Sequence, residues 1–213
     1  AHEIKNPLTP MKLNIQHLQR TLNNLEKDEL ISKVTKTSEI LIEQIDTLSS
    51  IASAFSSFAK MPEPNIEKIN IINLLQDTVH LFRDTENTEI SFASGGIKEL
   101  NVLADREHFK RAVLNLIKNA IQAISENTQG QVAVSVSKNY GKVLIQVKDD
   151  GVGISEENRM KIFQPNFSTK TEGMGLGLAL VKSAVESFGG KIYFETKIGE
   201  GSSFTIELEE AKN

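Results

Sequence analysis

The chain has 213 residues, of which 39% are hydrophobic and 24% charged, which is enough to bury a core in one large domain or two modest ones. Its 24 basic and 28 acidic residues give a net charge of −4, which argues against a basic nucleic-acid platform. Cysteine is absent, and this excludes disulfides, Cys-ligated zinc, iron–sulfur clusters and thiol catalysis. No run of about 18 apolar residues is present, so we expect no membrane span within this sequence.

The distribution of glycine and proline divides the chain. Residues 1–59 contain no glycine, and all 13 glycines lie from Gly95 onward. Between these regions, Pro62 and Pro64 are expected to end a helix and to stiffen a connector. We therefore predict an α+β protein with a helical part at 1–60, a linker at 61–65 and a mixed part at 66–213.

The first part has a heptad pattern that predicts a helical hairpin. Apolar residues alternate at intervals of four and three, and a second series runs from Ile31 to Phe55 after a polar break at 23–28. The first series consists of Ile4, Leu8, Met11, Ile15, Leu18, Leu22 and Leu25. A lone hairpin would leave half of each narrow stripe in water, whereas two copies forming a four-helix bundle would bury it. We therefore predict a homodimer through residues 1–59.

The remaining part alternates between strand and helix patterns. Strands are predicted at 66–69, 89–93, 101–104, 131–137, 142–148, 191–196 and 203–208, and helices at 71–83, 105–125 and 176–188. Asp105 is a suitable N-cap for the second of these helices. The pattern predicts a layer of helices on a mostly antiparallel sheet. We expect His17, His80 and His108 on the surface, and we predict no zinc site.

The first candidate site is the segment that begins at His2. His2 lies two residues before the apolar Ile4, so it should point away from the helical core, with Asn6 one turn along on the same face. A neutral imidazole nitrogen can capture a phosphoryl group near physiological pH, and Glu3 could accept the ring proton. An exposed histidine without a chemical role is the simpler alternative for this residue taken alone.

The second candidate site is a stripe of amide side chains on the predicted helix at 105–125. Asn115, Asn119 and Gln122 share one face, opposite the apolar face of that helix. An amide oxygen can ligate Mg²⁺, which prefers oxygen ligands. A polar face turned to solvent is the alternative, although lysine or glutamate would favour a helix more than asparagine does.

Two glycine-rich segments complete the set. In the first, Asp149 follows a strand and could accept a hydrogen bond from an adenine amino group, while Gly151 and Gly153 would let the backbone approach a ligand. An ordinary turn is the alternative. In the second, alternating glycines lead into a helix and expose backbone N–H groups that can bind an anion. This segment contains Gly173, Gly175, Gly177 and Leu178. The sequence has no P-loop pattern, and a dinucleotide fingerprint would need glycine at position 178.

These motifs occur in a specific order: H-E-I-K-N-P-L, N-L-I-K-N-A, D-x-G-x-G, a phenylalanine segment at 162–167, and G-x-G-L-G-L. In this order the chain resembles, over nearly its whole length, the kinase core of a two-component sensor histidine kinase. The motifs look like the H, N, G1, F and G2 boxes of that family. The resemblance implies a dimerisation and phosphoacceptor domain at 1–60 and an ATP-binding domain of the Bergerat type at 66–213.

The resemblance also implies roles for the residues of the first two motifs. His2 would accept the γ-phosphoryl group of ATP, with Glu3 as general base. Asn6 would orient a water molecule when the enzyme acts as a phosphatase. Asn119 would ligate Mg²⁺, and Asn115 would lie close to the phosphates.

For the later motifs, the resemblance implies contacts with the nucleotide and with a lid over it. Asp149 would hold the adenine amino group, and Gly151 and Gly153 would pass close to the base. Phe163 and Phe167 would anchor the lid, although plain core aromatics are nearly the same prediction. The remaining nucleotide-binding candidates, which would cradle phosphates or hinge the lid, are Gly173, Gly175, Gly177 and Leu178.

Three details are similar to the nitrogen-regulation sensor kinases within this family. The stretch between Phe167 and Gly173 is a short lid of five residues, 168–172. Gln122 stands where many members carry lysine or arginine, and we include it among the nucleotide-binding candidates. The third detail is the H-E-I-K-N-P-L-T-P segment together with F-S-T-K. Lys170 in the lid is a candidate phosphate contact, with a solvated lysine as its alternative.

The resemblance implies a response-regulator receiver domain as the partner that takes the phosphoryl group from His2. Because the chain begins one residue before His2, we expect a longer cytoplasmic protein with an upstream sensor region and, outside this sequence, a possible inner-membrane anchor. Three rival functions remain open: an ATPase of the same nucleotide fold, a non-catalytic dimeric binding module, and a protein-serine kinase that shares this ATP-binding domain. The ATPases carry a glutamate four residues before the metal asparagine, where this chain has Asn115.

Overall fold

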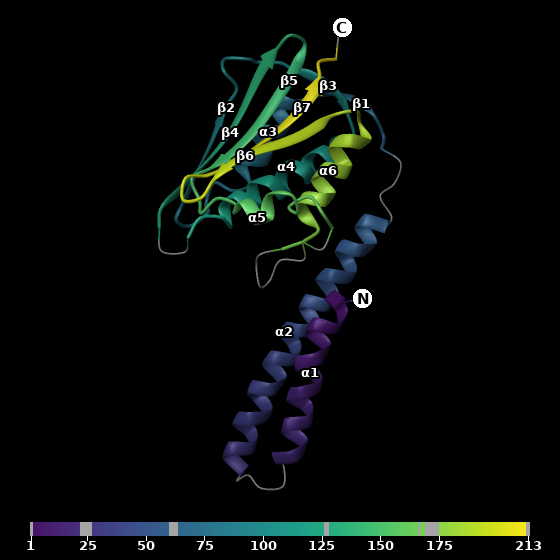
Figure 1. Cartoon of the computed structure of the whole chain (residues 1–213), viewed down its shortest axis with the longest axis vertical. Helices are drawn as coiled ribbons and strands as arrows, with labels where there is room; N and C mark the ends of the chain where they lie inside the picture. The colour runs from purple at the N-terminus through teal and green to yellow at the C-terminus, as the bar shows by residue number, and fades with distance from the viewer. Residues whose placement is uncertain are drawn as a thin grey trace. The chain divides into compact units, whose positions relative to one another are not determined.

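The computed structural model describes residues 2–21, 27–59, 64–125, 128–165, 167–168 and 175–211. The chain forms two compact units, one containing residues 1–61 and the other residues 62–167 and 175–213. Each unit has its own secondary structure, and each is described separately below (Figure 1). This division into a helical part and an α/β part confirms the predicted fold class.

The first unit contains a helical hairpin of α1 (His2–Thr21) and α2 (Lys27–Ala59). The less exposed described residues recur every three or four positions along both helices, as expected for two helices packed along one stripe. Several apolar residues of the heptad stripes remain exposed to water in a single chain. This confirms the prediction that a lone hairpin leaves part of each stripe uncovered. The exposed fractions are 45% for Leu8, 42% for Ile15, 56% for Ile31 and 51% for Ile45.

The second unit alternates strands and helices, largely as predicted. Its elements are β1 (Glu67–Asn70), α3 (Ile71–His80), β2 (Thr88–Ala93), β3 (Asn101–Ala104), α4 (Arg106–Ile121), β4 (Gly130–Asn139), β5 (Lys142–Asp149), α5 (Glu156–Arg159), α6 (Gly177–Ser187), β6 (Lys191–Lys197) and β7 (Gly201–Glu209). The short helix α5 was not predicted. Its sequence signal is Ser155 at the N-cap position, followed by two glutamates in the first turn.

The strands form a five-stranded sheet in the order β2-β4-β5-β7-β6. Only β2 and β4 pair in parallel, and the other neighbours in this sheet are antiparallel, which confirms the predicted sheet type. The strands β1 and β3 instead pair with each other in a separate two-stranded sheet. Its edge is joined to the end of β7, because Val102 bridges Glu210 and the Ala211 N–H donates to the Asn101 carbonyl.

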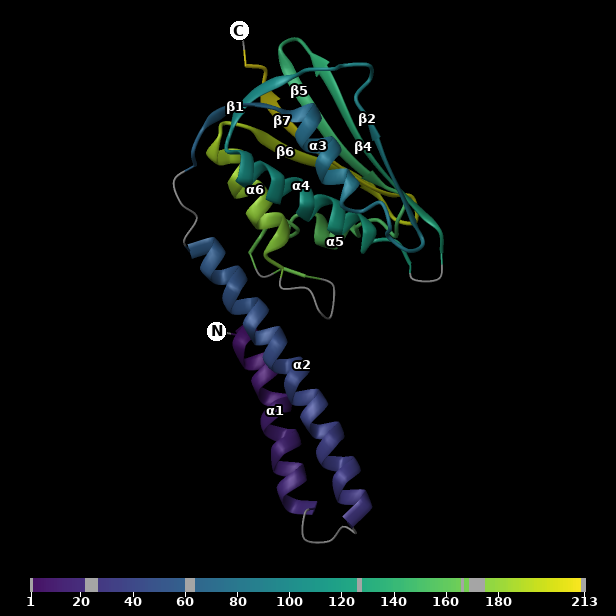
Figure 2. The ribbon, with the colours of Figure 1, turned by 180° about the vertical axis from the view of Figure 1, so that it is seen from behind.

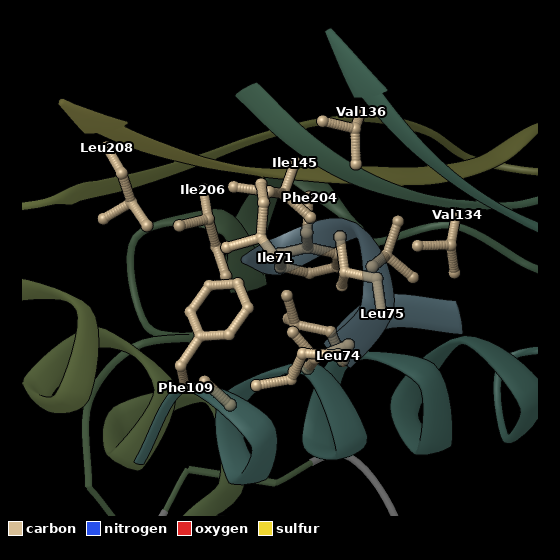
Figure 3. Packing of buried hydrophobic residues seen from close by; sticks show 14 of the residues in the cluster. Ile71, Leu74, Leu75, Phe109, Val134, Val136, Ile145, Phe204, Ile206 and Leu208 are labelled. Atoms are coloured by element: carbon tan, nitrogen blue, oxygen red, sulfur yellow. The ribbon is translucent and has the colours of Figure 1, made fainter. Parts of the chain in front are cut away.

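The core of the second unit lies between the large sheet and a layer of helices on one of its faces (Figure 2). Side chains from α3 and α4 meet side chains from β4, β5 and β7 in this layer (Figure 3). Phe109 on α4 is fully buried and packs edge-on against Phe188, with 6.4 Å between ring centroids. Each large apolar side chain buried in this way contributes about 1.5–3 kcal/mol to the stability of the fold. The second unit therefore has a stabilising core of its own.

The N-terminus of α4 is fixed by Asp105, as the sequence predicts. The carboxylate of Asp105 accepts the His108 N–H at 2.8 Å through Oδ1 and the Asn65 N–H at 2.8 Å through Oδ2. Burial works to raise the pKa of Asp105, but the N–H groups of His108 and Asn65 and the charge of His108 outweigh it and lower the pKa. The carboxylate therefore connects the residues that precede β1 to the start of α4.

His108 corrects one prediction. We expected it on the surface, but it is only 7% exposed, and its Nδ1 lies 3.9 Å from Asp105 Oδ2. It occupies the first turn of α4 beside the buried Phe109, so the helix side counted as polar in the sequence faces protein there. His17 and His80 are exposed, as predicted.

Two helices end earlier than predicted. The helix α3 ends at His80 rather than near residue 83, and α4 ends at Ile121 rather than near residue 125. After α4 the chain turns, and the carbonyl of Ala123 accepts a hydrogen bond from the Val152 N–H at 3.0 Å. The helix therefore gives way to a turn whose backbone holds the loop that follows β5.

Candidate functional site

The loop that follows β5 is built around Asp149. This residue ends the strand and is 3% exposed. Its Oδ1 accepts hydrogen bonds from the Gly151 N–H at 3.0 Å and from the Ser202 N–H at 3.2 Å. Two N–H donors hold this carboxylate in one orientation, so it is preorganised to accept a hydrogen bond from a ligand.

The two glycines of this loop are needed for close approach of other backbone segments. A Cβ atom on Gly151 would lie 2.4 Å from the Ala123 carbonyl oxygen, and one on Gly153 would lie 2.3 Å from the Lys197 carbonyl oxygen. Gly153 also has a φ of +71°. We predicted these glycines from approach to a ligand, but the structure gives them a second reason, the packing of the loop between α4 and the β6–β7 hairpin.

A second cluster brings α4 and α6 together. Asn115 and Asn119 are both partly exposed on α4. A Cβ atom built on Gly177 would lie 3.8 Å from Asn115 Oδ1 and 3.9 Å from Asn119 Nδ2, so the first residue of α6 lies against this asparagine pair. Among the described residues, no side chain caps α6, whose N-cap is Leu176. The N–H groups of this helix start therefore lie beside two amide side chains, an arrangement suited to phosphate.

Other predicted residues lie near these clusters. Gly175 has a φ of +62° just before α6, and Leu178 packs partly buried against the core. Gln122 is the exposed C-cap residue of α4, one turn beyond Asn119. Lys170 and Gly173 lie outside the described residues.

The phenylalanines of the predicted F box pack into the domain. Phe163 makes edge-on contacts with Phe194 and Phe204, with centroid distances of 5.9 and 6.4 Å. Lys182 of α6 lies 5.9 Å from the centre of the Phe163 ring. Phe167 also packs against the hydrophobic core. The rings therefore attach the segment after α5 to the sheet, which fits both an anchor for a lid and plain core aromatics.

The backbone of α1 includes His2, Glu3 and Asn6, which lie within its first two turns. The side chains of residues 2–6 lie outside the described part of the structure. The mutual arrangement of these three side chains therefore stays a prediction. The helix continues through Pro7 and Pro10, and Pro7 is buried.

Sequence reasoning missed two polar residues beside the Asp149 loop. Ser202 donates its N–H to Asp149, and Thr196 accepts the Ile154 N–H at 2.9 Å through Oγ1. Both residues lie on the β6–β7 hairpin, which we predicted only as sheet. The glycines of that hairpin, Gly199 and Gly201, gave a turn signal but no indication that the hairpin contacts a loop far away in sequence.

Comparison with known proteins identifies the class. Residues 104–212 match the family described as histidine kinase-, DNA gyrase B-, and HSP90-like ATPase, and residues 1–61 match the His Kinase A (phospho-acceptor) domain. The chain therefore belongs to the histidine kinase-, DNA gyrase B- and HSP90-like ATPase family. Because it joins this ATP-binding domain to a phospho-acceptor domain, it is the kinase core of a sensor histidine kinase, similar to the nitrogen regulation protein NtrY.

The similar proteins agree with this assignment. The chain is 33% identical to NtrY of Azorhizobium caulinodans, over 90% of this chain and 25% of that protein. It is 31% identical to the sensor histidine kinase ZraS of Escherichia coli, over 98% of this chain and 43% of that protein. The chain thus spans between a quarter and less than half of the length of these curated relatives.

Solved structures show the same fold. The catalytic domain of histidine kinase ThkA matches with a TM-score of 0.61 and 34% identity, over 68% of this chain and 96% of that one. ThkA in complex with the response regulator protein TrrA matches with a TM-score of 0.73 and 26% identity, over 99% of this chain and 60% of that one. Within the described residues, no helix has both the length and the apolar character needed to cross a membrane.

Proposed function

We propose that this chain transfers the γ-phosphoryl group of ATP to His2 and then passes it to an aspartate of a response-regulator receiver domain. The observation that carries the proposal is the joint presence of two parts in one chain. One is a nucleotide-binding domain with a buried Asp149 and with an uncapped helix start beside Asn115 and Asn119. The other is a phospho-acceptor segment that contains His2 and Glu3.

In the nucleotide site, each cluster would hold one end of ATP. The oriented carboxylate of Asp149 would accept a hydrogen bond from the adenine amino group, and Gly151 and Gly153 would line the base. The helix start at Gly175, Gly177 and Leu178, together with Gly173, would donate backbone N–H groups to the phosphates. Gln122 and Lys170 are further candidates at the phosphate end, and Phe163 and Phe167 would anchor the lid.

The asparagine pair suits Mg²⁺, which takes oxygen ligands and keeps several waters. Asn119 would supply an amide oxygen, and Asn115 would lie near the phosphates. Both side chains are partly exposed and next to the α6 start, so the donor set of amide, phosphate and water oxygens fits this ion. The bound ion would neutralise charge on the β- and γ-phosphates.

At the acceptor, a ring nitrogen of His2 would attack the γ-phosphorus as the bond to the bridging oxygen of ADP breaks. Glu3 would take the proton from the other ring nitrogen, so that the phosphorylated imidazole is left neutral. In the reverse role, Asn6 would orient a water molecule for hydrolysis of the phosphorylated response regulator. Positioning rather than covalent help from the protein would supply most of the rate, as is usual for phosphoryl transfer.

We further propose the division into 1–60, a linker at 61–65 and a catalytic domain at 66–213. The hydrogen bond between Asn65 and Asp105 supports a boundary at this point, because it attaches the end of the proposed linker to the catalytic domain. Two copies would form a homodimer through residues 1–59, supported by the exposed half of the heptad pattern. Because its substrate is ATP, we place this core in the cytoplasm. Any membrane anchor would lie in other segments of a longer protein.

Incubation with γ-labelled Mg·ATP tests the proposal. We expect protein-bound label that survives alkali and is lost in acid, because a phosphorus–nitrogen bond has this stability. The label should disappear in His2→Gln. It should remain in His17→Gln, which removes an exposed histidine from the same helix and so serves as the matched control.

Other outcomes select among the rival functions. Binding of ADP without any labelling would favour a non-catalytic nucleotide module. Release of inorganic phosphate without protein-bound label would favour an ATPase of the same fold, although Asn115 lacks the carboxylate that could activate a water molecule. Acid-stable label would indicate phosphorylation of a hydroxyl group instead of His2.

A further inference from the structure

The β6–β7 hairpin is in direct contact with the Asp149 loop. The Gly199 N–H donates to the Val152 carbonyl at 2.9 Å, and the Ser202 N–H donates to Asp149 Oδ1 at 3.2 Å. A Cβ atom on Gly201 would lie 2.0 Å from the Asp149 carbonyl oxygen, so the two backbones are in direct contact there. The orientation of Asp149 therefore depends on where this hairpin lies.

Thr196 is the residue on which these contacts converge. Its Oγ1 accepts the Ile154 N–H at 2.9 Å and lies 3.1 Å from the Gly201 carbonyl oxygen and 2.9 Å from Ser202 Oγ. Because Ile154 uses this oxygen as an acceptor, the hydroxyl proton is available for Gly201 or Ser202. The Thr196 side chain thus connects Ile154, at the end of the loop, with β7, whose Ser202 N–H donates to Asp149.

The main chain of Thr196 extends the same network. Its carbonyl accepts a hydrogen bond from Arg159 Nη2 at 2.8 Å, which joins the end of α5 to β6. Arg159 is also paired with Glu156 at 3.0 Å. The loop from Asp149 to Ile154 and the short helix after it are therefore both attached to β6 at a single residue.

We propose that Thr196 is a positioning residue of the nucleotide site, whose hydroxyl group sets the orientation of the Asp149 loop toward the adenine base. This inference rests on the proposed function of that loop and deepens it. Thr196 acts through Ile154 and Ser202 rather than by contact with ATP. Its loss should weaken binding of the adenine end of the nucleotide and leave phosphoryl transfer at saturating ATP unchanged.

The variant Thr196→Val tests this role because valine has nearly the same shape but no hydroxyl group. Without it, the partly buried Ile154 N–H loses its acceptor, and we expect the Kd for Mg·ADP to rise about tenfold in calorimetric titration. Thr196→Ser keeps the hydroxyl group and should stay within about threefold of the unsubstituted chain. In the labelling assay, Thr196→Val should raise the KM for ATP and leave kcat unchanged.

A second readout separates positioning from general loss of stability. Guanine presents a carbonyl oxygen where adenine has its amino group, so an oriented Asp149 carboxylate should repel GDP. A loosened loop should therefore reduce the preference for ADP over GDP, whereas partial unfolding would weaken both nucleotides equally. The matched control is Thr78→Val, which removes the hydroxyl of a buried threonine that donates to Leu74 on α3. It should lower stability without changing this preference.

The outcomes are distinct. If the unsubstituted chain binds no ADP, the proposed function fails and this inference fails with it. If it binds ADP and Thr196→Val binds within about twofold of it, only the positioning role is wrong. Equal weakening by Thr196→Val and Thr196→Ser, or an unchanged preference for ADP over GDP in the valine variant, would also overturn the role of the hydroxyl group.

Discussion

The helical hairpin and the α/β unit bury their apolar residues to very different extents. In the α/β unit, the large core residues from Ile69 to Ile206 are almost fully buried within one chain. In the hairpin, several heptad residues keep about two-fifths or more of their surface in water, including Val34 at 39%, Ile45 at 51% and Ile31 at 56%. Only the α/β unit therefore completes its core alone, whereas the hairpin presents an apolar surface that a second copy could cover.

This difference follows from the sequence patterns. A heptad stripe occupies two positions in seven and is suited to packing between helices, yet in the hairpin part of this stripe, including Ile31 and Ile45, remains exposed. The sheet unit instead alternates buried and more exposed residues along β4 and β5, and a layer of helices covers the buried face (Figure 2). A substitution in the core should therefore lower the stability of the α/β unit within one chain. A substitution in the exposed stripe should instead weaken the association of two chains.

The largest expected effect is that of Phe109→Ala. Removing a fully buried ring leaves a cavity between α4 and the sheet and should destabilise the α/β unit by about 3–5 kcal/mol. The chain has two tyrosines, Tyr140 and Tyr193, and no tryptophan, so tyrosine fluorescence during urea unfolding reports this unit alone.

The matched control is Leu13→Ala, because Leu13 is 59% exposed on α1. It should not move the tyrosine transition. An equal shift in both variants would mean that the two units unfold together, and the comparison between them would then be wrong.

The second effect concerns association. Ile45→Asp places a charge in the exposed stripe of α2, which the proposed bundle would bury twice per dimer. We expect dimerisation to weaken by about 3 kcal/mol or roughly a hundredfold, because a buried unpaired carboxylate is costly. Sedimentation velocity at tens of micromolar measures the change, and the affinity for Mg·ADP should be unaltered.

Ser32→Asp adds the same charge on an exposed position away from the stripe and should leave the dimer intact. If the unsubstituted chain already sediments as a monomer, the prediction that residues 1–59 form a homodimer is wrong. If both aspartate variants dissociate equally, net charge rather than the stripe controls association.

Periodicity was sufficient to predict most of the fold. The heptad intervals predicted both helices of the hairpin, and alternation predicted the strands of the large sheet, because both patterns reflect which face is buried. The site residues Asp149, Asn115 and Asn119 could be selected from motif order, and the structure brings Gly177 against both asparagines.

Contacts between residues distant in sequence could not be predicted. His108 looks like a residue of a polar helix face, but it is buried, with its ring near the Asp105 carboxylate. Thr196 lies in an ordinary alternating strand, and only the fold brings it to Ile154, 42 residues earlier. Gly151 and Gly153 were assigned to a ligand although their nearest neighbours are backbone atoms of the protein itself.

A smaller effect is expected from Asp105→Asn, which replaces one of the two acceptor oxygens by a donor. Either the His108 N–H or the Asn65 N–H then loses its partner, so the α/β unit should lose about 1–2 kcal/mol. The tyrosine-monitored urea transition measures the loss. Asp77→Asn, on an exposed position of α3, is the control and should have little effect.

The loss of stability caused by Asp105→Asn should depend on pH. The pKa of Asp105 is lowered from its ordinary value of 3.8 in the folded state, so the carboxylate stabilises the fold fully above that value. Its contribution is lost as the pH falls through the lower folded pKa. The difference between the unsubstituted chain and Asp105→Asn should therefore be constant from neutral pH down to about 5 and shrink below about 4. A difference that grows on acidification would contradict the proposed hydrogen bonds.

The smallest expected effect is that of Lys182→Met, which tests what attaches the segment after α5 to the domain. Lys182 lies over the Phe163 ring and 3.8 Å from Glu186, but both charged side chains are about half exposed. An exposed cation–π contact and an exposed ion pair together contribute no more than about 1 kcal/mol, and methionine keeps much of the side-chain packing.

Phe163→Ala removes two aromatic contacts and should cost several times more. If Lys182→Met weakened Mg·ADP binding as much as Phe163→Ala did, the attachment would depend on charge rather than on burial of the ring. The α/β unit would then resemble the hairpin in depending on groups at its surface.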